Sequence, residues 1–131
     1  MTIRIGEIAP DFTVDTTAGK LTFHDWIGSS WAFFFSHPAD FTPVCTTEMG
    51  RTAQLDNEFK SRNTKPIGLS TDTVEEHVKW IKDVDETQNT TLEFPIIADK
   101  DLAISKQYGM IHPAESETAA VRTVYIIDPN K

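Results

Sequence analysis

Trp31-Ala32-Phe33-Phe34-Phe35 is the longest unbroken apolar run of the chain, and it decides how the rest must fold. Since every side chain of the run is apolar, we expect both faces of this segment to be covered, as in an inner strand of a mainly parallel sheet. A loop with two prolines follows at residues 36–44, and a proline-free stretch that suits a helix follows at residues 45–62. A strand, a loop and a helix in this order predict one unit of an α/β fold.

The same alternation continues along the chain. Thr73 and Glu76 have the spacing of a capping box, and the helix that they begin is predicted to end near residue 84. Its apolar face, at helical spacing, consists of Val74, His77, Val78, Ile81 and Val84. A shorter helix is predicted at residues 102–108, before Gly109. Further strands are predicted at the short apolar runs 12–14, 21–23, 66–69, 94–97 and 121–127. The first two of these are predicted to form either a short hairpin or two separate edge strands.

The composition fits one compact domain. The chain has 131 residues, of which 39 % are hydrophobic, enough for a core and too many for a disordered chain. A formal net charge of −8 disfavours nucleic acid and anionic membrane surfaces as partners. The apolar runs are too short to span a bilayer, and the first residues do not form an export signal. Together with a single cysteine, these features lead us to expect a cytoplasmic protein.

The cysteine occupies a reactive kind of position. Cys45 opens the predicted helix, so its sulfur would meet unpaired backbone N–H groups and the positive end of the helix dipole, both of which favour a thiolate. Pro43 suits the first helical turn, and the hydroxyl of Thr42 is close enough to reach the sulfur or a bound oxygen. A buried cysteine that only packs as a small hydrophobe fits the spacing equally well.

Arg122, at the start of the last predicted strand, is a second candidate. A guanidinium in this place must reach solvent or meet an anion, because burying it unpaired is costly. In a parallel sheet it could lie near Cys45, where it would stabilise a thiolate and orient a substrate oxygen. The simpler interpretation is an ordinary arginine at the end of a strand.

The histidines do not form a metal-binding pattern. They are His24, His37, His77 and His112. No two of them have ligand-like spacing, so no metal is expected. His77 lies on the apolar face of its helix and is expected to pack there. His37 precedes Pro38 on the loop to Cys45, so a Cys–His pair is conceivable. Glu48, one turn later, suits a helix start and could bond to a neighbouring cation.

Residues 36–48 resemble the active-site segment of peroxiredoxins, the AhpC/TSA family, and most closely that of their one-cysteine branch, where Thr-Pro-Val-Cys-Thr-Thr-Glu is distinctive. Pro38, Thr42 and Cys45 supply the Pro-x-x-x-Thr-x-x-Cys signature of that family. Arg122 fits its active-site arginine. The resemblance extends over essentially the whole chain.

The resemblance implies a thioredoxin-like α/β fold, with a central mixed, mainly parallel sheet flanked by helices, in one domain over residues 1–131. It also implies a thiol peroxidase of antioxidant defence, in which Cys45 attacks hydrogen peroxide or an organic hydroperoxide and becomes a sulfenic acid. Thr42 and Arg122 would hold the two peroxide oxygens, and Pro38 would shield the sulfur from water. The supporting pocket residues that the resemblance implies are His37, Val44 and Glu48.

The resemblance further implies that the reaction needs no metal, haem or flavin and uses an external reductant such as thioredoxin or glutathione. It also implies a homodimer or higher oligomer. Because family members usually continue further, we expect a chain truncated at its C-terminal end, with any resolving cysteine beyond Lys131. Some vertebrate members also hydrolyse phospholipids, with a serine, a histidine and an aspartate at the positions of Ser30, His24 and Asn130. That activity is not expected here, because Asn130 is not a carboxylate.

Two other classes of function remain open at this point. A cysteine hydrolase or acyl transferase that used Cys45 and His37 would need a carboxylate to orient the histidine and an oxyanion hole, and neither is visible in the spacing. A thioredoxin-like binding module would contain a structural, unreactive cysteine. A disulfide reductase is disfavoured, because the sequence has no Cys-x-x-Cys.

Overall fold

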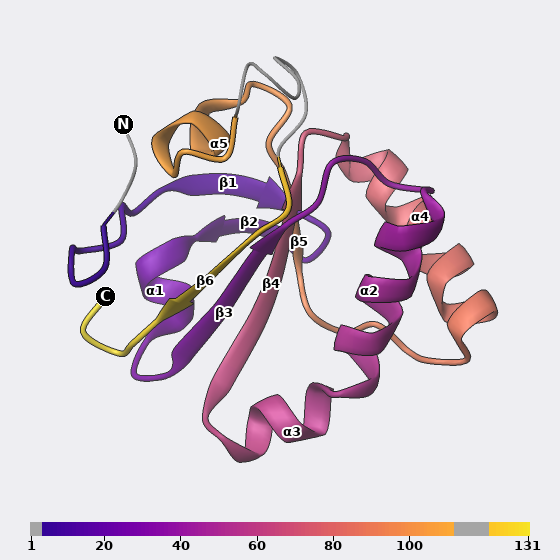
Figure 1. Cartoon of the computed structure of the whole chain (residues 1–131), viewed down its shortest axis with the longest axis horizontal. Helices are drawn as coiled ribbons and strands as arrows, with labels where there is room; N and C mark the ends of the chain where they lie inside the picture. The colour runs from indigo at the N-terminus through magenta and orange to yellow at the C-terminus, as the bar shows by residue number, and fades with distance from the viewer. Residues whose placement is uncertain (1–3, 112–120) are drawn as a thin grey trace.

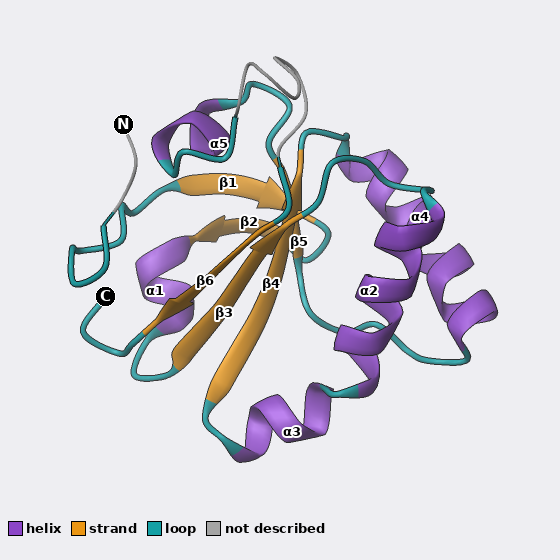
Figure 2. Cartoon of the chain, in the orientation of Figure 1, coloured by secondary structure: helices purple, strands orange, loops and turns teal. Residues whose placement is uncertain are grey.

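The computed structural model describes residues 4–111 and 121–131, which form one sheet with helices packed around it (Figure 1). Strands and helices alternate through most of the chain, as predicted from the sequence (Figure 2). In chain order the elements are β1 (Thr13–Thr16), β2 (Gly19–Thr22), α1 (Phe23–Ile27), β3 (Trp31–Ser36), α2 (Pro43–Gln54), α3 (Asp56–Ser61), β4 (Thr64–Ser70), α4 (Val74–Gln88), β5 (Ile96–Ala98), α5 (Ala103–Gln107) and β6 (Thr123–Ile127).

The sheet is mixed, and its strands lie in the order β2-β1-β5-β4-β3-β6. The centre is parallel, because β4 pairs in the parallel sense with both β3 and β5. The pairs β1–β2, β1–β5 and β3–β6 are antiparallel, so the prediction of mainly parallel pairing holds only for the centre. The apolar content of residues 121–127 identifies a strand but not its direction. Because β6 runs against β3, its first residue, Thr123, lies opposite the last, Ser36.

Some boundaries differ from the sequence prediction. The hairpin of β1 and β2 forms, but Phe23 begins α1 instead of extending β2. The stretch 45–62 contains two helices instead of one, with Leu55 between them. The N–H of Leu55 is shared between the carbonyls of Arg51 and Thr52, which is typical of a helix end. The predicted helix near the C-terminus is α5, and Gly109 after it has φ +71°, in the left-handed region.

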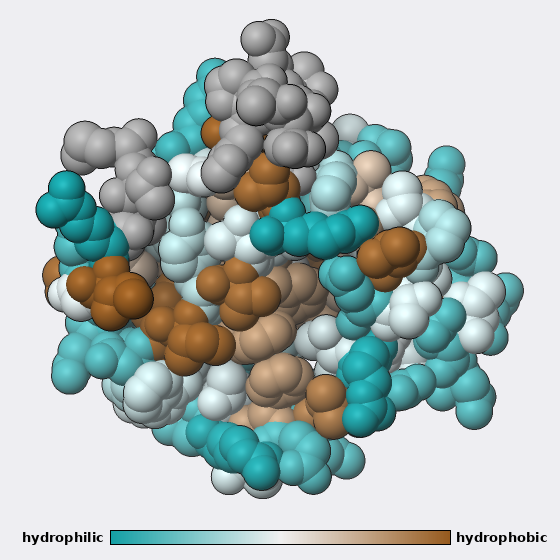
Figure 3. All heavy atoms as spheres, viewed as in Figure 1, coloured by the Kyte–Doolittle hydropathy of each residue, from teal (hydrophilic) through white to brown (hydrophobic). Residues whose placement is uncertain are grey.

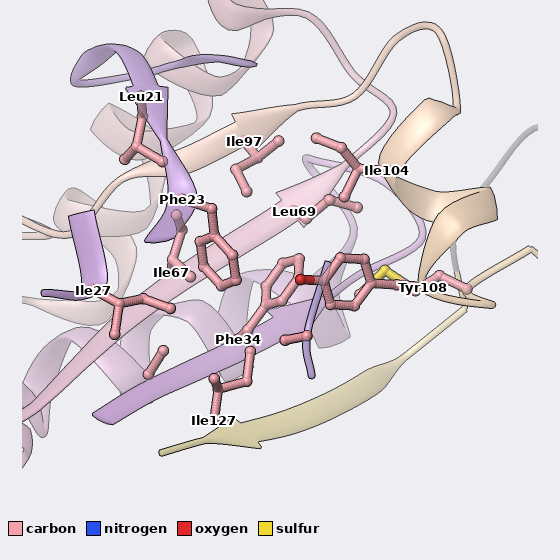
Figure 4. Close-up of a cluster of buried hydrophobic side chains, with 13 residues drawn as sticks. Leu21, Phe23, Ile27, Phe34, Ile67, Leu69, Ile97, Ile104, Tyr108 and Ile127 are labelled. Carbon is pink, nitrogen blue, oxygen red and sulfur yellow. The ribbon is translucent and has the colours of Figure 1, made fainter. Parts of the chain in front are cut away.

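The inner strand β3 separates two apolar clusters. Successive side chains of a strand point to opposite faces, so Phe34 packs in one cluster and Phe35 in the other. Figure 4 shows the first cluster, in which the ring of Phe34 lies 5.3 Å from that of Phe23 and 5.1 Å from that of Tyr108. The second cluster contains Cys45. The prediction that both faces of this strand are covered is therefore confirmed.

Helix α4 lies beside α2 on one face of the sheet (Figure 1). Its predicted capping box is present, since the side chain of Thr73 accepts from the Glu76 N–H and the Glu76 carboxylate accepts from the Thr73 N–H, both at 3.2 Å. Its buried residues are His77, Trp80 and Val84. The prediction for Val78 is wrong, because this side chain is 44 % exposed and Trp80 occupies the interior instead.

One edge of the described sheet is β6, which carries exposed apolar side chains. Val124 is 54 % and Ile126 is 61 % exposed, and Trp31 at the start of β3 is 43 % exposed. Figure 3 shows brown, hydrophobic atoms gathered over β6. In the described part of the chain, no helix has both the length and the apolar character that a membrane span requires.

Candidate active site

Cys45 lies in the first turn of α2, as the sequence predicts. Thr42 precedes the helix with an extended backbone, Pro43 begins it, and the Thr46 N–H donates to the Thr42 carbonyl at 2.9 Å. Pro43 has no N–H, and no side chain of the described residues caps the other N–H groups of this turn. The positive end of the helix dipole therefore acts directly on a cysteine that is only 1 % exposed.

Arg122 contacts the sulfur of Cys45. Its Nη1 donates to Sγ at 3.0 Å, and this hydrogen bond raises the pKa of the Arg122 guanidinium. Arg122 and Cys45 lie close together as predicted, but the strand after Arg122 is antiparallel to β3 and not parallel as expected. Arg122 immediately precedes β6, and the antiparallel β6 starts at the end of β3 from which the loop to α2 departs. The result is a fixed positive charge beside a buried sulfur.

Ser36 holds the start of β6 in place. Its Oγ donates to the carbonyl of Val121 and accepts from the N–H of Thr123 at 3.1 Å. These two hydrogen bonds flank Arg122 on both sides in sequence. Ser36 is itself buried at the end of β3. It therefore fixes the backbone from which the guanidinium reaches Cys45, a role that the sequence did not indicate.

Thr42 and Glu48 lie on either side of Cys45 in sequence. The Thr42 hydroxyl donates to the Ala39 carbonyl at 3.1 Å, so its proton is used within the loop while its lone pairs can still accept. Glu48 Oε2 lies 3.8 Å from Arg122 Nη1, and the two side chains are 51 % and 42 % exposed. An ion pair with this exposure contributes little to stability.

Two of the remaining predicted site residues, Pro38 and Val44, are apolar. Pro38 is half-buried in the loop before α2, and Val44 in the first turn is 55 % exposed. A groove of about 560 Å³ lies beside Arg122, between β3, β6 and the helices α2 and α3. Its apolar lining residues are Phe33, Phe35, Leu55, Phe59 and Val124.

His37 belongs to a buried hydrogen-bond chain. Its Nε2 lies 2.7 Å from Asp40 Oδ1, while Asp40 Oδ2 lies 2.5 Å from Nδ1 of His77. The chain ends at the Ile97 carbonyl, 2.9 Å from His77 Nε2. Burial alone would raise the pKa of Asp40, but the hydrogen bonds with both histidines outweigh burial and hold this pKa below its ordinary value. His77 is thus buried as predicted, but as a hydrogen-bonding residue and not merely a packed one.

Asp72 and Ser70 extend this network. Asp72 Oδ2 accepts from the Asp40 N–H at 2.8 Å and from the Ser70 hydroxyl at 2.7 Å. His37, Asp40 and Asp72 offer atoms within 4.8 Å of one another that could bind a metal. Both carboxylate oxygens of Asp40 are already hydrogen-bonded to histidines, Oδ1 to His37 and Oδ2 to His77. The expectation that no metal is required stays a prediction.

Asp40 is the functional candidate that sequence reasoning missed. Asp40 supplies a carboxylate that orients His37, although no such carboxylate was visible in the spacing of the sequence. Two features of the sequence point to this role for Asp40. Asp40 lies three residues after His37, and the polar His77 lies on an otherwise apolar helix face. Within residues 4–111 and 121–131, however, Cys45 Sγ has a hydrogen bond with Arg122 and none with His37. The geometry therefore favours an arginine-paired thiol over a Cys–His pair.

The serine and histidine of the phospholipase-like set have other partners. Ser30 Oγ donates to Asn63 Oδ1 at 3.1 Å, and His24 Nε2 lies 2.7 Å from the Ala9 carbonyl. Ser30 is a turn residue before β3. No hydrogen bond joins these two side chains among the described residues.

The family model described as AhpC/TSA matches residues 5–131. The chain belongs to the AhpC/TSA family. The expected resemblance to peroxiredoxins, and to their one-cysteine branch, is therefore confirmed.

Relatives with known names agree with this assignment. The chain is 48 % identical to the 1-Cys peroxiredoxin of Dictyostelium discoideum, over 98 % of this chain and 54 % of that protein. It is 45 % identical to peroxiredoxin-6 of Homo sapiens, over 97 % of this chain and 60 % of that protein. The chain therefore spans between about half and two thirds of the length of these relatives.

Solved structures confirm the fold class. The yeast mitochondrial 1-Cys peroxiredoxin superposes with a TM-score of 0.93 at 45 % identity, covering 99 % of this chain and 64 % of that one. A mutant of the peroxiredoxin 6 of Arenicola marina gives a TM-score of 0.92 at 44 % identity, covering 98 % and 61 %. The chain has the thioredoxin-like fold of these proteins, as predicted.

Proposed function

We propose that this protein is a thiol-dependent peroxidase that reduces hydrogen peroxide and organic hydroperoxides, with Cys45 as the reacting group. The observation that carries the proposal is the 3.0 Å hydrogen bond from Arg122 Nη1 to Cys45 Sγ at an uncapped helix start. Arginine and backbone donors together favour a thiolate and also suit the charge that develops on a leaving oxygen. Relatives named peroxiredoxins support the same reaction.

In the proposed reaction the Cys45 thiolate attacks the terminal oxygen of the peroxide. The S–O bond forms as the O–O bond breaks, and Cys45 becomes a sulfenic acid. The other oxygen leaves with the electron pair of the O–O bond and takes up a proton, which gives water or an alcohol. Arg122 stabilises the negative charge on this leaving oxygen. Thr42, whose own proton is bonded to Ala39, accepts the hydrogen bond of the peroxide O–H.

The surroundings of the thiol would control which molecules reach it. With Cys45 1 % exposed, Pro38 in the preceding loop would limit access of bulk water and slow further oxidation of the sulfenic acid. Val44 and the apolar groove beside Arg122 would receive the organic part of an alkyl hydroperoxide. Glu48 would hold the guanidinium between itself and the sulfur.

Turnover requires electrons from outside the chain. An external thiol would attack the sulfenic acid to give a mixed disulfide and water, and a second thiol would release the Cys45 thiol and a disulfide. Thioredoxin or glutathione would suit this role, and a yeast relative is described in terms of glutathione and thioredoxin systems. We further propose that the reaction needs no metal, haem or flavin. We propose that the chain forms a homodimer or higher oligomer and acts in a reducing compartment such as the cytoplasm. We also propose that residues 1–131 form one domain.

Chemical trapping tests this proposal. The chain is treated with one equivalent of hydrogen peroxide together with a sulfenic-acid trap, and the peptide that contains Cys45 is analysed by mass spectrometry. We expect one trap adduct on Cys45 and none on the Cys45→Ser variant, which should also lose peroxide turnover. A wild type that forms no adduct but consumes an activated ester at Cys45 would instead indicate a hydrolase or acyl transferase.

A further inference from the structure

The buried chain around Asp40 contains a histidine whose two ring nitrogens both face acceptors. His77 Nε2 lies 2.9 Å from the Ile97 carbonyl oxygen, which can only accept, so Nε2 carries a proton. His77 Nδ1 lies 2.5 Å from Oδ2 of Asp40. With Asp40 ionised, Nδ1 must carry a proton as well. The geometry therefore describes an imidazolium paired with a carboxylate, both fully enclosed by protein.

The same carboxylate determines where the proton of His37 lies. Asp40 Oδ1 accepts from His37 Nε2 at 2.7 Å, which assigns a proton to Nε2. The lowered pKa of Asp40 agrees with an ionised carboxylate in this place. In the neutral ring of His37, Nδ1 then keeps a lone pair. Among the described residues, it is the one buried side-chain nitrogen or oxygen without a hydrogen-bond partner. Such an atom needs a functional explanation, because buried polar atoms are almost always paired.

Helix α4 also ties the ring of His37 to the wall of the thiol site. Trp80, one turn after His77, packs with its ring 4.8 Å from that of His37. The indole N–H of Trp80 donates to Thr46 Oγ1 at 2.9 Å, and Thr46 is the neighbour of Cys45 in α2. Trp80 and Cys45 belong to the same buried cluster. One face of α4 thus holds both the loop that carries His37 and the helix that carries the thiol.

We propose that His77 is a positioning residue of the thiol site. Its imidazolium keeps Asp40 as a carboxylate, and Asp40 in turn keeps the proton of His37 on Nε2 and the lone pair on Nδ1. A reactant bound at the thiol can then give a hydrogen bond to Nδ1, the atom that the resting protein leaves unpaired. This last part rests on the proposed peroxidase function, whereas the protonation pattern does not.

Nitrogen NMR spectra of the histidine rings of the full chain test the protonation pattern directly. In the wild type we expect both nitrogens of His77 to be protonated, and His37 to carry a proton on Nε2 only. A neutral His77, or a proton on His37 Nδ1, would overturn the proposal without recourse to any variant. If the spectrum is as expected but the protein does not react with peroxide, the protonation pattern is supported and the peroxidase function is overturned.

Two variants of His77 separate its two hydrogen bonds. His77→Gln places its amide where Nε2 lies and keeps the bond to Ile97, but it removes the donor to Asp40. His77→Asn places its amide where Nδ1 lies and keeps the donor to Asp40. We expect His77→Gln to move a proton onto His37 Nδ1 and to slow the reaction of Cys45 with peroxide on the order of tenfold to a hundredfold. His77→Asn should keep the His37 pattern and most of the rate.

Val84→Ala, also buried on α4, is the matched control for a general loss of packing. It should lower stability while leaving the spectrum of His37 and the peroxide rate close to wild type. An equal loss of rate in Val84→Ala and His77→Gln would contradict the positioning role. So would a His77→Gln protein whose His37 spectrum and peroxide rate are both unchanged.

Discussion

The starts of helices α2 and α4 have the same kind of sequence but are built differently. Both begin after a threonine with an extended backbone, Thr42 and Thr73. Thr73 forms a complete capping box with Glu76, so its helix start is satisfied by its own side chains. Thr42 makes no such cap, and its hydroxyl donates back to Ala39. The uncapped start is the one that carries Cys45. One helix start is thus closed by its own side chains, while the other has no side-chain cap from Thr42 where it carries Cys45.

Removal of Arg122 should have the largest effect on the α2 site. In Arg122→Ala we expect the rate of Cys45 with hydrogen peroxide to fall by about two to three orders of magnitude, because one charged donor to the sulfur and to the leaving oxygen is lost. Stopped-flow kinetics measures this rate. Stability should change by less than about 0.5 kcal/mol, since the side chain is 42 % exposed.

The control for this variant is Arg51→Ala, which removes another exposed guanidinium from the same groove. Its rate should stay within about twofold of wild type, since Arg51 bonds to Gln54 and not to the sulfur. An equal loss in both variants would mean that the general positive charge of the groove, and not the contact with Cys45, matters.

Thr42→Val should produce the next largest effect. Valine has nearly the same shape as threonine but cannot accept a hydrogen bond from the peroxide, so we expect the rate to fall about a hundredfold. The unfolding midpoint in urea should change little, because Thr42 does not cap its helix. A loss of stability without a loss of rate would show that Thr42 serves the loop alone.

Thr73→Ala should give the opposite result. Loss of the capping box should lower the free energy of unfolding by about 1 kcal/mol. The peroxide rate should remain within about twofold of wild type, since Thr73 does not contact the thiol site. Urea denaturation and stopped-flow kinetics on the same samples measure both quantities. A slow but stable Thr73→Ala protein would remove the distinction between the two helix starts.

Glu48→Gln should have the smallest effect. Its carboxylate is 3.8 Å from Arg122 and half exposed, so the ion pair contributes at most about 1 kcal/mol to holding the guanidinium. We expect a change in peroxide rate of about threefold or less, which should disappear at high ionic strength because salt screens exposed charges. A persistent tenfold change in high salt would instead assign Glu48 a direct role with the substrate.

Features with a short-range cause could be predicted from the sequence. The inner strand at Trp31–Ser36 follows from an apolar run, and the capping box of α4 from Thr73 and Glu76. The place of Cys45 at a helix start follows from the proline-marked loop before it. In each case the residues that cause the structure lie within a few positions of one another.

Features with a long-range cause could not be predicted in this way. The direction of β6 depends on its pairing with β3, and this direction brings Arg122 to Cys45. The choice between Val78 and Trp80 for the interior depends on how α4 packs, because both positions are compatible with a helical stripe. The link from Asp40 to His77 joins residues 37 positions apart and appears only in the folded chain.

The rate constant of Cys45 with hydrogen peroxide is the sharpest test of whether Arg122 and the start of α2 activate the thiol. It is measured by stopped flow on the reduced chain and compared with that of free cysteine at the same pH, with both rates corrected for the thiolate fraction. We predict that Cys45 reacts about a thousandfold faster or more, since Arg122 and the uncapped turn act on the transition state as well as on the thiolate. A rate constant equal to that of free cysteine thiolate would mean that neither Arg122 nor the start of α2 activates Cys45.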